Sequence, residues 1–235
     1  RDVERSRGLG DVYKRQMLCH PHNPVGTAFS KDELVLFFEW INARDLYVCS
    51  DEIHCDLLLE PNFRHHPFAA VSPEASSRTI TLMAPSKTFN LPGFGCSFAI
   101  ISDARLRNRF RKSISGIVPD PPAMGFILAE AAYRFGEPWR KDLLHYILLN
   151  RNLAIERIAQ IPFLTAFSAQ ATYLLWIDAR KIPVSNPHAY FEKNGVGLSD
   201  GKDFGAPGFL RLNLGCSQEL LSRALERIDR ACNSF

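Results

Sequence analysis

Apolar positions along the chain follow the periods of alternating strands and helices. Four short apolar runs, rich in β-branched and other large side chains, predict buried strands with turn residues after them. The runs cover residues 17–20, 46–50, 79–83 and 96–102. Since buried strands with apolar residues on both faces are typical of parallel sheets, these runs predict a largely parallel sheet.

An amphipathic helix is predicted between the first two strands, over residues 30–45. Ser30 and Glu33 have the spacing of a capping box, in which each side chain binds a backbone N–H at the helix start. Apolar residues then recur at helical spacing, at Leu34, Phe37, Phe38 and Ile41. Strands separated by such a helix indicate an α/β fold.

The pattern changes after residue 103, where long helical periods predominate. Helices are predicted over 104–115, 124–135 and 138–160, two strands within 163–178, a glycine-rich loop over 194–208 and a strand over 209–214. Ser217 is expected to cap a last helix whose apolar face holds Leu220, Leu221, Ala224, Leu225 and Ile228. This half is therefore expected to be a smaller α+β domain. We expect a disordered or non-native leader at 1–16, part of a large domain at 17–145 and a small domain at 146–235.

Composition and charge exclude several classes of protein. Of the net charge of +3 over 235 residues, +2 falls within residues 1–16, so the folded part carries no basic stripe for nucleic acid. The six cysteines form no C-x-x-C pair, and no apolar run approaches the roughly 18 residues that span a bilayer. We expect a soluble cytoplasmic protein without disulfides. Four residues are of types that bind zinc: His20, His22, His54 and Cys55. Their spacing matches no closed Cys/His pattern, so no metal site is predicted.

Chemically active side chains follow three of the predicted strands. Asn23 comes after the first, Asp51 ends the second and Lys87 follows the third. In open α/β sheets, ligands bind beyond the carboxyl ends of the strands. An amide, a carboxylate and an amine there would converge on one small heteroaromatic ligand.

Four motifs in order carry a family resemblance. They are H-P-H-N-P-V-G at 20–26, S-D-E-I-H at 50–54, A-P-S-K-T-F-N-L-P-G at 84–93 and F-L-R-L-N-L-G at 209–215. Together they resemble fold-type I pyridoxal-phosphate enzymes of the aminotransferase class I/II superfamily. S-D-E-I-H-C-D with S-K-T-F-N-L-P-G is similar to the MalY/PatB branch of cystathionine β-lyases. The resemblance implies part of a mostly parallel pyridoxal-phosphate-transferase sheet followed by the small domain.

The resemblance also implies roles for individual residues. Lys87 would form the Schiff base with pyridoxal 5′-phosphate and move the substrate proton. Asp51 would pair with the protonated pyridine nitrogen and Asn23, after a cis peptide to Pro24, would donate to the 3-hydroxyl oxygen. Two further cofactor contacts and one substrate contact are implied: Ser86 near the phosphate, His54 at the cofactor, and Arg211 on the substrate carboxylate.

Each of these residues also has a plainer interpretation. Asp51 could cap a turn, and Asn23 before Pro24 is a common turn pair. Arg211 could belong to a structural ion pair, and His54 could face solvent instead of a cofactor. The pair His65–His66 is expected at the surface.

The implied activity is β-elimination on cystathionine or a similar cysteine S-conjugate, giving thiol, pyruvate and ammonia. The chain departs from the aminotransferase pattern at three places: His54 stands where tyrosine is common, Ala84 where serine is common, and no arginine lies near Gly95. The missing arginine favours this carbon–sulfur lyase branch over aminotransferases. The alternatives are a class I/II aminotransferase and a non-catalytic regulatory module with this fold. The substrate would be a small amino acid and the full-length enzyme a homodimer. Since complete members begin well before the first strand seen here, the chain resembles their C-terminal portion.

Overall fold

The computed structural model describes residues 15–235, and these form two compact units. The first unit comprises residues 15–21, 28–56 and 64–140, and the second 22–27, 57–63 and 141–235. Of the predicted leader, residues 1–14 lie outside the described residues, while Arg15 and Gln16 already belong to the first strand. The expected domain ranges, 17–145 and 146–235, stay a prediction.

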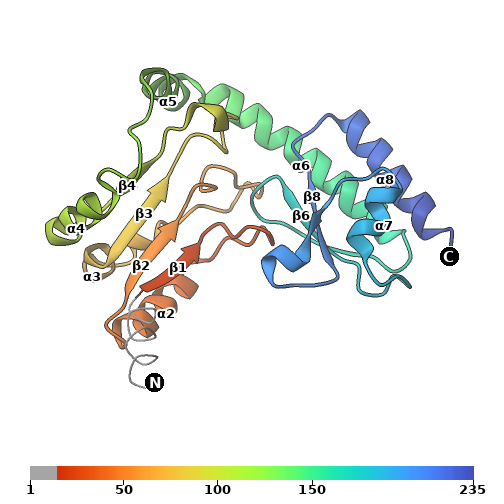
Figure 1. Cartoon of the computed structure of the whole chain (residues 1–235), viewed down its shortest axis with the longest axis horizontal. Coiled ribbons are helices and arrows are strands. Elements are labelled where there is room, and N and C mark those ends of the chain that lie inside the picture. Colours follow the sequence, from red (N-terminus) through yellow and green to blue (C-terminus); the bar gives the residue numbers. More distant parts are fainter. Residues whose placement is uncertain (1–14) are drawn as a thin grey trace. The chain divides into compact units, whose positions relative to one another are not determined.

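The first unit is built on a four-stranded sheet in the order β1-β2-β3-β4 (Figure 1). Strands β1 (Arg15–Cys19), β2 (Tyr47–Asp51) and β3 (Thr79–Met83) are parallel, which confirms the predicted α/β class. The prediction of a fourth buried strand over 96–102 is wrong. β4 (Phe98–Ile100) is shorter and antiparallel, and within residues 15–235 it pairs only with β3. Phe98 and Ile100 are 41% and 51% exposed, because among the residues described the face of the sheet that they share is not packed into a buried core.

Helices complete the first unit. α2 (Lys31–Asn42) begins at the predicted capping box, with Ser30 and Glu33 bonded reciprocally, and its Leu34 and Ile41 pack in a core with Phe68. The further helices are α3 (Pro73–Ser77), α4 (Ala104–Ile114), α5 (Ala123–Phe135) and the start of α6 (Glu137–Ala159), with short 3-10 turns η1 (Phe68–Ala70) and η2 (Pro92–Phe94). Among the residues described, no helix is long and apolar enough to cross a membrane.

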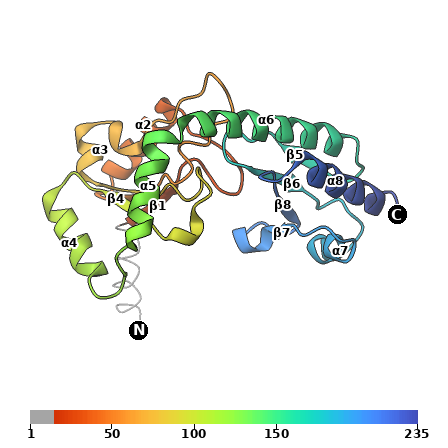
Figure 2. The same cartoon turned by 90° about the horizontal axis from the view of Figure 1, so that it is seen from above.

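The second unit is an antiparallel sheet packed against helices. Its strand order is β5 (Thr165–Phe167), β6 (Leu174–Asp178), β8 (Phe209–Asn213) and β7 (Ser199–Asp200). α6 and α8 (Gln218–Cys232) run side by side along it (Figures 1 and 2), and their apolar faces share one core with β6 and β8. Ser217 caps α8 as predicted.

Two expectations for the second unit are wrong, and one helix was not predicted. The predicted loop over 194–208 contains β7 and the turn η3 (Gly201–Phe204). The preceding helix α7 (Pro187–Lys193) was not predicted, although Asn186 supplies a side-chain cap and Pro187 occupies the first turn. Leu220 is 54% exposed, because the buried face of α8 is narrower than the sequence pattern suggests.

His20 is a fully buried polar group at the end of β1. Its Nδ1 accepts from the Phe29 N–H (3.3 Å) and its Nε2 lies 3.2 Å from the carbonyl oxygen of His66, so the ring is held as a neutral donor and acceptor. Burial, followed by the neighbouring His65, lowers the pKa of His20 to about 4. An unfolded chain would therefore bind a proton at His20 in mild acid that the folded chain does not.

This linkage predicts a loss of stability in mild acid. Neutral His20 contributes to the free energy of unfolding in full above the unfolded pKa of about 6.5, and this contribution is lost as the pH falls towards about 4. The total loss is about 3 kcal/mol. Thermal unfolding of wild type and His20→Asn over this pH range measures it. The variant should have the shallower pH dependence, and equal slopes would contradict the assignment.

Gly26 joins the segment 22–27 to the rest of the second unit. Its carbonyl oxygen accepts from the N–H groups of Gln170 and Ala171, both at 3.0 Å. Its φ is +78°, and an added Cβ would lie 2.5 Å from Ala169 Cβ and 2.9 Å from the Ala171 oxygen. Both the conformation and the close approach therefore require glycine.

Gly26→Ala should destabilise the second unit by about 2–4 kcal/mol, through overpacking and a left-handed backbone. Gly197→Ala is the matched control, because a Cβ at Gly197 meets nothing within 4 Å. Denaturant unfolding of the two variants checks this. Equal stabilities would show that residues 22–27 are not held as described.

Candidate functional site

Asp51 and Lys87 lie at the carboxyl ends of adjacent parallel strands in the first unit. Asp51 is the last residue of β2 and is paired in register with Leu82 of β3, and Lys87 lies in the turn that follows β3. One carboxylate oxygen of Asp51, Oδ1, accepts from the Ile53 N–H at 3.2 Å, so Asp51 does cap a turn. Its Oδ2 makes no hydrogen bond with the residues described and is available to a ligand.

Lys87 presents its amine from a tight turn. Backbone bonds from Phe89 N–H to the Pro85 oxygen and from Leu91 N–H to the Ser86 oxygen hold this turn. The Lys87 side chain is exposed, and within residues 15–235 its ammonium has no hydrogen bond or ion pair. Ser86 is half-buried beside it. The turn therefore offers an unpaired amine with a hydroxyl next to it.

Two histidines of the first unit lie deeper than the plainer interpretations assumed. His54 is only 4% exposed, so the alternative that it faces solvent is wrong: the turn after β2, closed by a bond from the Cys55 N–H to the Glu52 oxygen, folds it inward. The expectation that His65 lies at the surface is also wrong. Its side chain is 12% exposed and its Nε2 is 2.6 Å from Glu52 Oε2.

Arg211 and Asn23 meet in the second unit. Arg211, in the middle of β8, donates from Nη1 to Asn23 Oδ1 at 2.8 Å and from Nη2 to Ser199 Oγ at 3.0 Å. Its guanidinium carbon lies 4.7 Å from the centre of the Phe204 ring. The peptide between Asn23 and Pro24 is cis, as the resemblance implied.

The partners of Arg211 are all uncharged. Among the residues described, no carboxylate lies within ion-pair distance of its guanidinium, so the alternative of a structural ion pair is wrong. Partial burial lowers the pKa of Arg211, yet a guanidinium stays protonated at any physiological pH. Each bonded Nη group retains a second N–H. Arg211 is thus a cation in a fixed position whose remaining N–H groups can bind a planar carboxylate.

Sequence reasoning missed three residues that support these groups: Glu52, Ser199 and Phe204. Glu52 stands within the S-D-E-I-H motif, and a carboxylate next to an apolar strand is a signal for a buried, paired charge. No sequence pattern marked Ser199 and Phe204 as site residues, because they fall in the stretch that was expected to be a loop. The histidines and cysteines do not gather into a metal site anywhere in residues 15–235.

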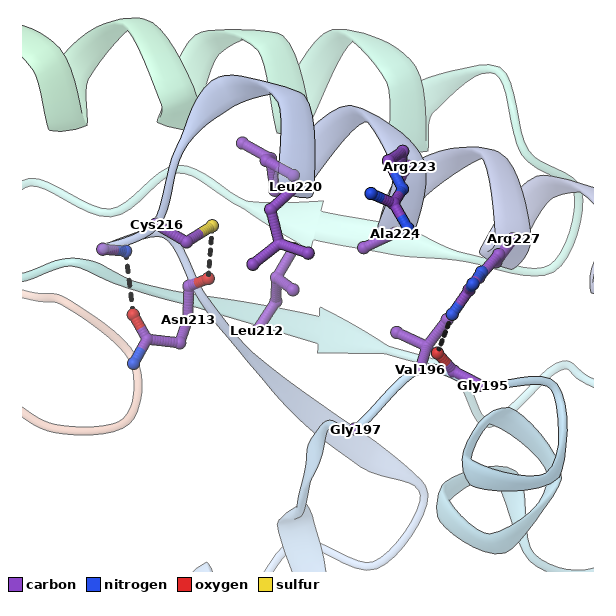
Figure 3. Close-up of a pocket in the computed structure, with 12 residues that line it drawn as sticks. Gly195, Val196, Gly197, Leu212, Asn213, Cys216, Leu220, Arg223, Ala224 and Arg227 are labelled. Carbon is purple, nitrogen blue, oxygen red and sulfur yellow. Dashed lines mark hydrogen bonds between the residues drawn. The ribbon is translucent and has the colours of Figure 1, made fainter.

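A groove of about 370 Å³ opens in the second unit between residues 195–197, the end of β8 and α8 (Figure 3). Its floor is apolar, with Val196 and Leu212, and Arg227 at its rim donates to the Gly195 carbonyl oxygen at 2.8 Å. None of the predicted site residues lines this groove. It is therefore not part of the candidate site.

Comparisons with known proteins identify the family. The sequence pattern of "Aminotransferase class I and II" matches residues 11–228. Cystathionine beta-lyase PatB of Bacillus subtilis is 35% identical to the chain, over 92% of this chain and 57% of PatB. The crystal structure of OvoB superposes with a TM-score of 0.93 at 44% identity, over 94% of this chain and 59% of that one.

A third relative is cystalysin from Treponema denticola, whose crystal structure contains pyridoxal 5′-phosphate. It superposes with a TM-score of 0.89 at 30% identity, over 97% of this chain and 61% of cystalysin. The chain thus spans about three-fifths of the length of these relatives. Because the family match extends over nearly all of the sequence, the chain belongs to the aminotransferase class I and II family.

Proposed function

We propose that the enzyme containing this chain is a pyridoxal-phosphate-dependent carbon–sulfur β-lyase. It would convert cystathionine or another cysteine S-conjugate and water into a thiol, pyruvate and ammonia. The observation that carries this proposal is the parallel pairing of β2 and β3. It sets a carboxylate, Asp51, at the carboxyl end of one strand and an unpaired amine, Lys87, in the turn after the other. The lyase identity of PatB supports the choice of reaction.

The residues present fit pyridoxal phosphate. Its aldehyde requires an accessible amine, and Lys87 is exposed and has no ion pair within residues 15–235. Its pyridine nitrogen requires a carboxylate oxygen that is not already hydrogen-bonded, and Asp51 Oδ2 is such an oxygen. The hydroxyl of Ser86 and the buried Oγ1 of Thr88, which has no hydrogen-bond partner among the residues described, are further polar groups in the Lys87 turn.

When bound, the cofactor supplies an electron sink for the carbanion at the substrate Cα. Residues of this chain move the protons and orient the substrate. The Nζ of Lys87 takes the α-proton, and the Asp51 carboxylate keeps the proton on the pyridine nitrogen, without which the ring would accept electrons poorly. Arg211 binds the substrate carboxylate through paired N–H groups and thereby orients the Cα–H bond. Loss of the thiolate from Cβ completes the elimination.

We also propose that the complete enzyme is a cytoplasmic homodimer. All six cysteines are free thiols, which fits a reducing compartment. The helix α5 has large apolar side chains facing solvent, with Met124, Phe126 and Ile127 each more than half exposed. An apolar surface of this kind is typical of one that another subunit covers.

Replacing Lys87 should abolish attachment of the cofactor. Wild-type chain titrated with pyridoxal phosphate should develop the long-wavelength absorbance of a lysine-bound cofactor, and Lys87→Ala should not. Lys112→Ala, which removes another exposed lysine of the first unit, should behave as wild type. Retention of the band in Lys87→Ala would overturn the assignment.

Arg211→Lys should raise the KM for the amino-acid substrate by tenfold or more, about 1.4 kcal/mol, with a smaller change in kcat, because an ammonium offers no bidentate fork. Arg180→Lys is the matched control, since Arg180 pairs with Asp178 at the surface of the same unit. Pyruvate and thiol release from cystathionine is the assay, in the full-length enzyme. Amine transfer dependent on a keto acid, without thiol release, would instead establish an aminotransferase.

A further inference from the structure

Glu52 is a buried carboxylate directly after Asp51. It is 1% exposed, and three donors surround it. Oε1 accepts from Ser50 Oγ at 2.8 Å and from the Phe68 N–H at 3.1 Å, while Oε2 is 2.6 Å from His65 Nε2. A carboxylate buried this deeply is stable only with such partners, so its position is strictly defined.

His65 extends this set of contacts to the end of β1. Its ring stacks on His20 with centroids 4.6 Å apart, and His20 in turn bonds Phe29 and His66. The segment that contains His65 and Phe68 is therefore tied to the end of β2 through Glu52 and to His20, after β1, through His65.

The peptide that joins Asp51 to Glu52 is hydrogen-bonded on both of its sides. The N–H of His20 donates to the Asp51 carbonyl oxygen at 2.9 Å, and the N–H of Glu52 donates to the Leu82 carbonyl oxygen at 3.0 Å. Both bonds are made by one peptide, so the Asp51 side chain projects from a backbone that is anchored on one side to His20, after β1, and on the other to β3. Glu52 also carries a buried charge, and its carboxylate must stay within reach of its three donors.

We propose that Glu52, through His65, is a positioning residue that fixes the Asp51 carboxylate against the cofactor ring. This inference rests on the proposed role of Asp51 and adds a supporting group to it. Glu52 touches neither the cofactor nor the substrate in this scheme. Removal of Glu52 leaves the Phe68 N–H and His65 without their acceptor, so the end of β2 gains freedom and Asp51 moves with it.

The Ile53 N–H reports the position of Asp51, because it donates to Asp51 Oδ1. Residue-resolved amide hydrogen exchange on the chain without cofactor therefore tests the proposal. Glu52→Ala should accelerate exchange at Ile53 and Phe68 by roughly tenfold or more, through local opening. Glu52→Gln keeps the size of the side chain and an oxygen for Ser50 and Phe68, and should give a smaller acceleration; it carries the test if Glu52→Ala does not fold.

Leu34→Ala is the control for general destabilisation, since Leu34 is buried in the core of the same unit. It should lower Tm and leave exchange at Ile53 unchanged. Unchanged exchange at Ile53 in both Glu52 variants, or equal acceleration in Leu34→Ala, would overturn the proposal.

A cofactor titration separates this proposal from the proposed function. Glu52→Ala should weaken pyridoxal phosphate binding about tenfold, as loss of an outer-shell partner does at other sites, and Leu34→Ala should not. Equal affinities in Glu52→Ala and wild type would show that Glu52 does not act on Asp51. Absence of cofactor binding by wild type would instead count against the proposed function, and the exchange of Ile53 would still decide whether Glu52 positions Asp51.

Discussion

Parallel pairing of β1, β2 and β3 is the constraint on which the first unit depends. Parallel strands end at a common edge, so residues that are far apart in the sequence leave the sheet as neighbours. In this sheet Asp51 is paired in register with Cys19 of β1 on one side and with Leu82 of β3 on the other. A slip by one residue would turn every side chain of β2 to the opposite face and remove the carboxylate from the edge.

The reactive groups are held in two physically different ways. Arg211 has neutral partners on two sides and an aromatic ring against its face, which fix the guanidinium plane without neutralising its charge. Asp51 is instead held through its backbone, by neighbours whose own polar groups are buried and paired. In both cases the ligand-binding group retains hydrogen-bonding capacity that the fold does not use.

Much of this arrangement could be predicted from the sequence, and the exceptions have physical causes. The capping box at Ser30, the strand at 79–83 and the Ser217 cap depend on local interactions, so short-range patterns suffice. The depth of His54 and His65 depends on how the segments after β2 fold back, which no local pattern records. β4 has the apolar composition of a buried strand, yet its exposure is set by neighbours that its own sequence does not specify. For the site, Lys87 and Arg211 were identified by motif, but the partners of Arg211 became visible only once β7 and η3 were in place.

The central claim is that the amine of Lys87 is where pyridoxal phosphate attaches. Borohydride reduction of the chain after incubation with the cofactor, followed by digestion and peptide mass mapping, tests it most directly. The account predicts a single stoichiometric pyridoxyl mass on the peptide that contains Lys87. A label spread over several surface lysines, or one concentrated at a different lysine, would contradict it.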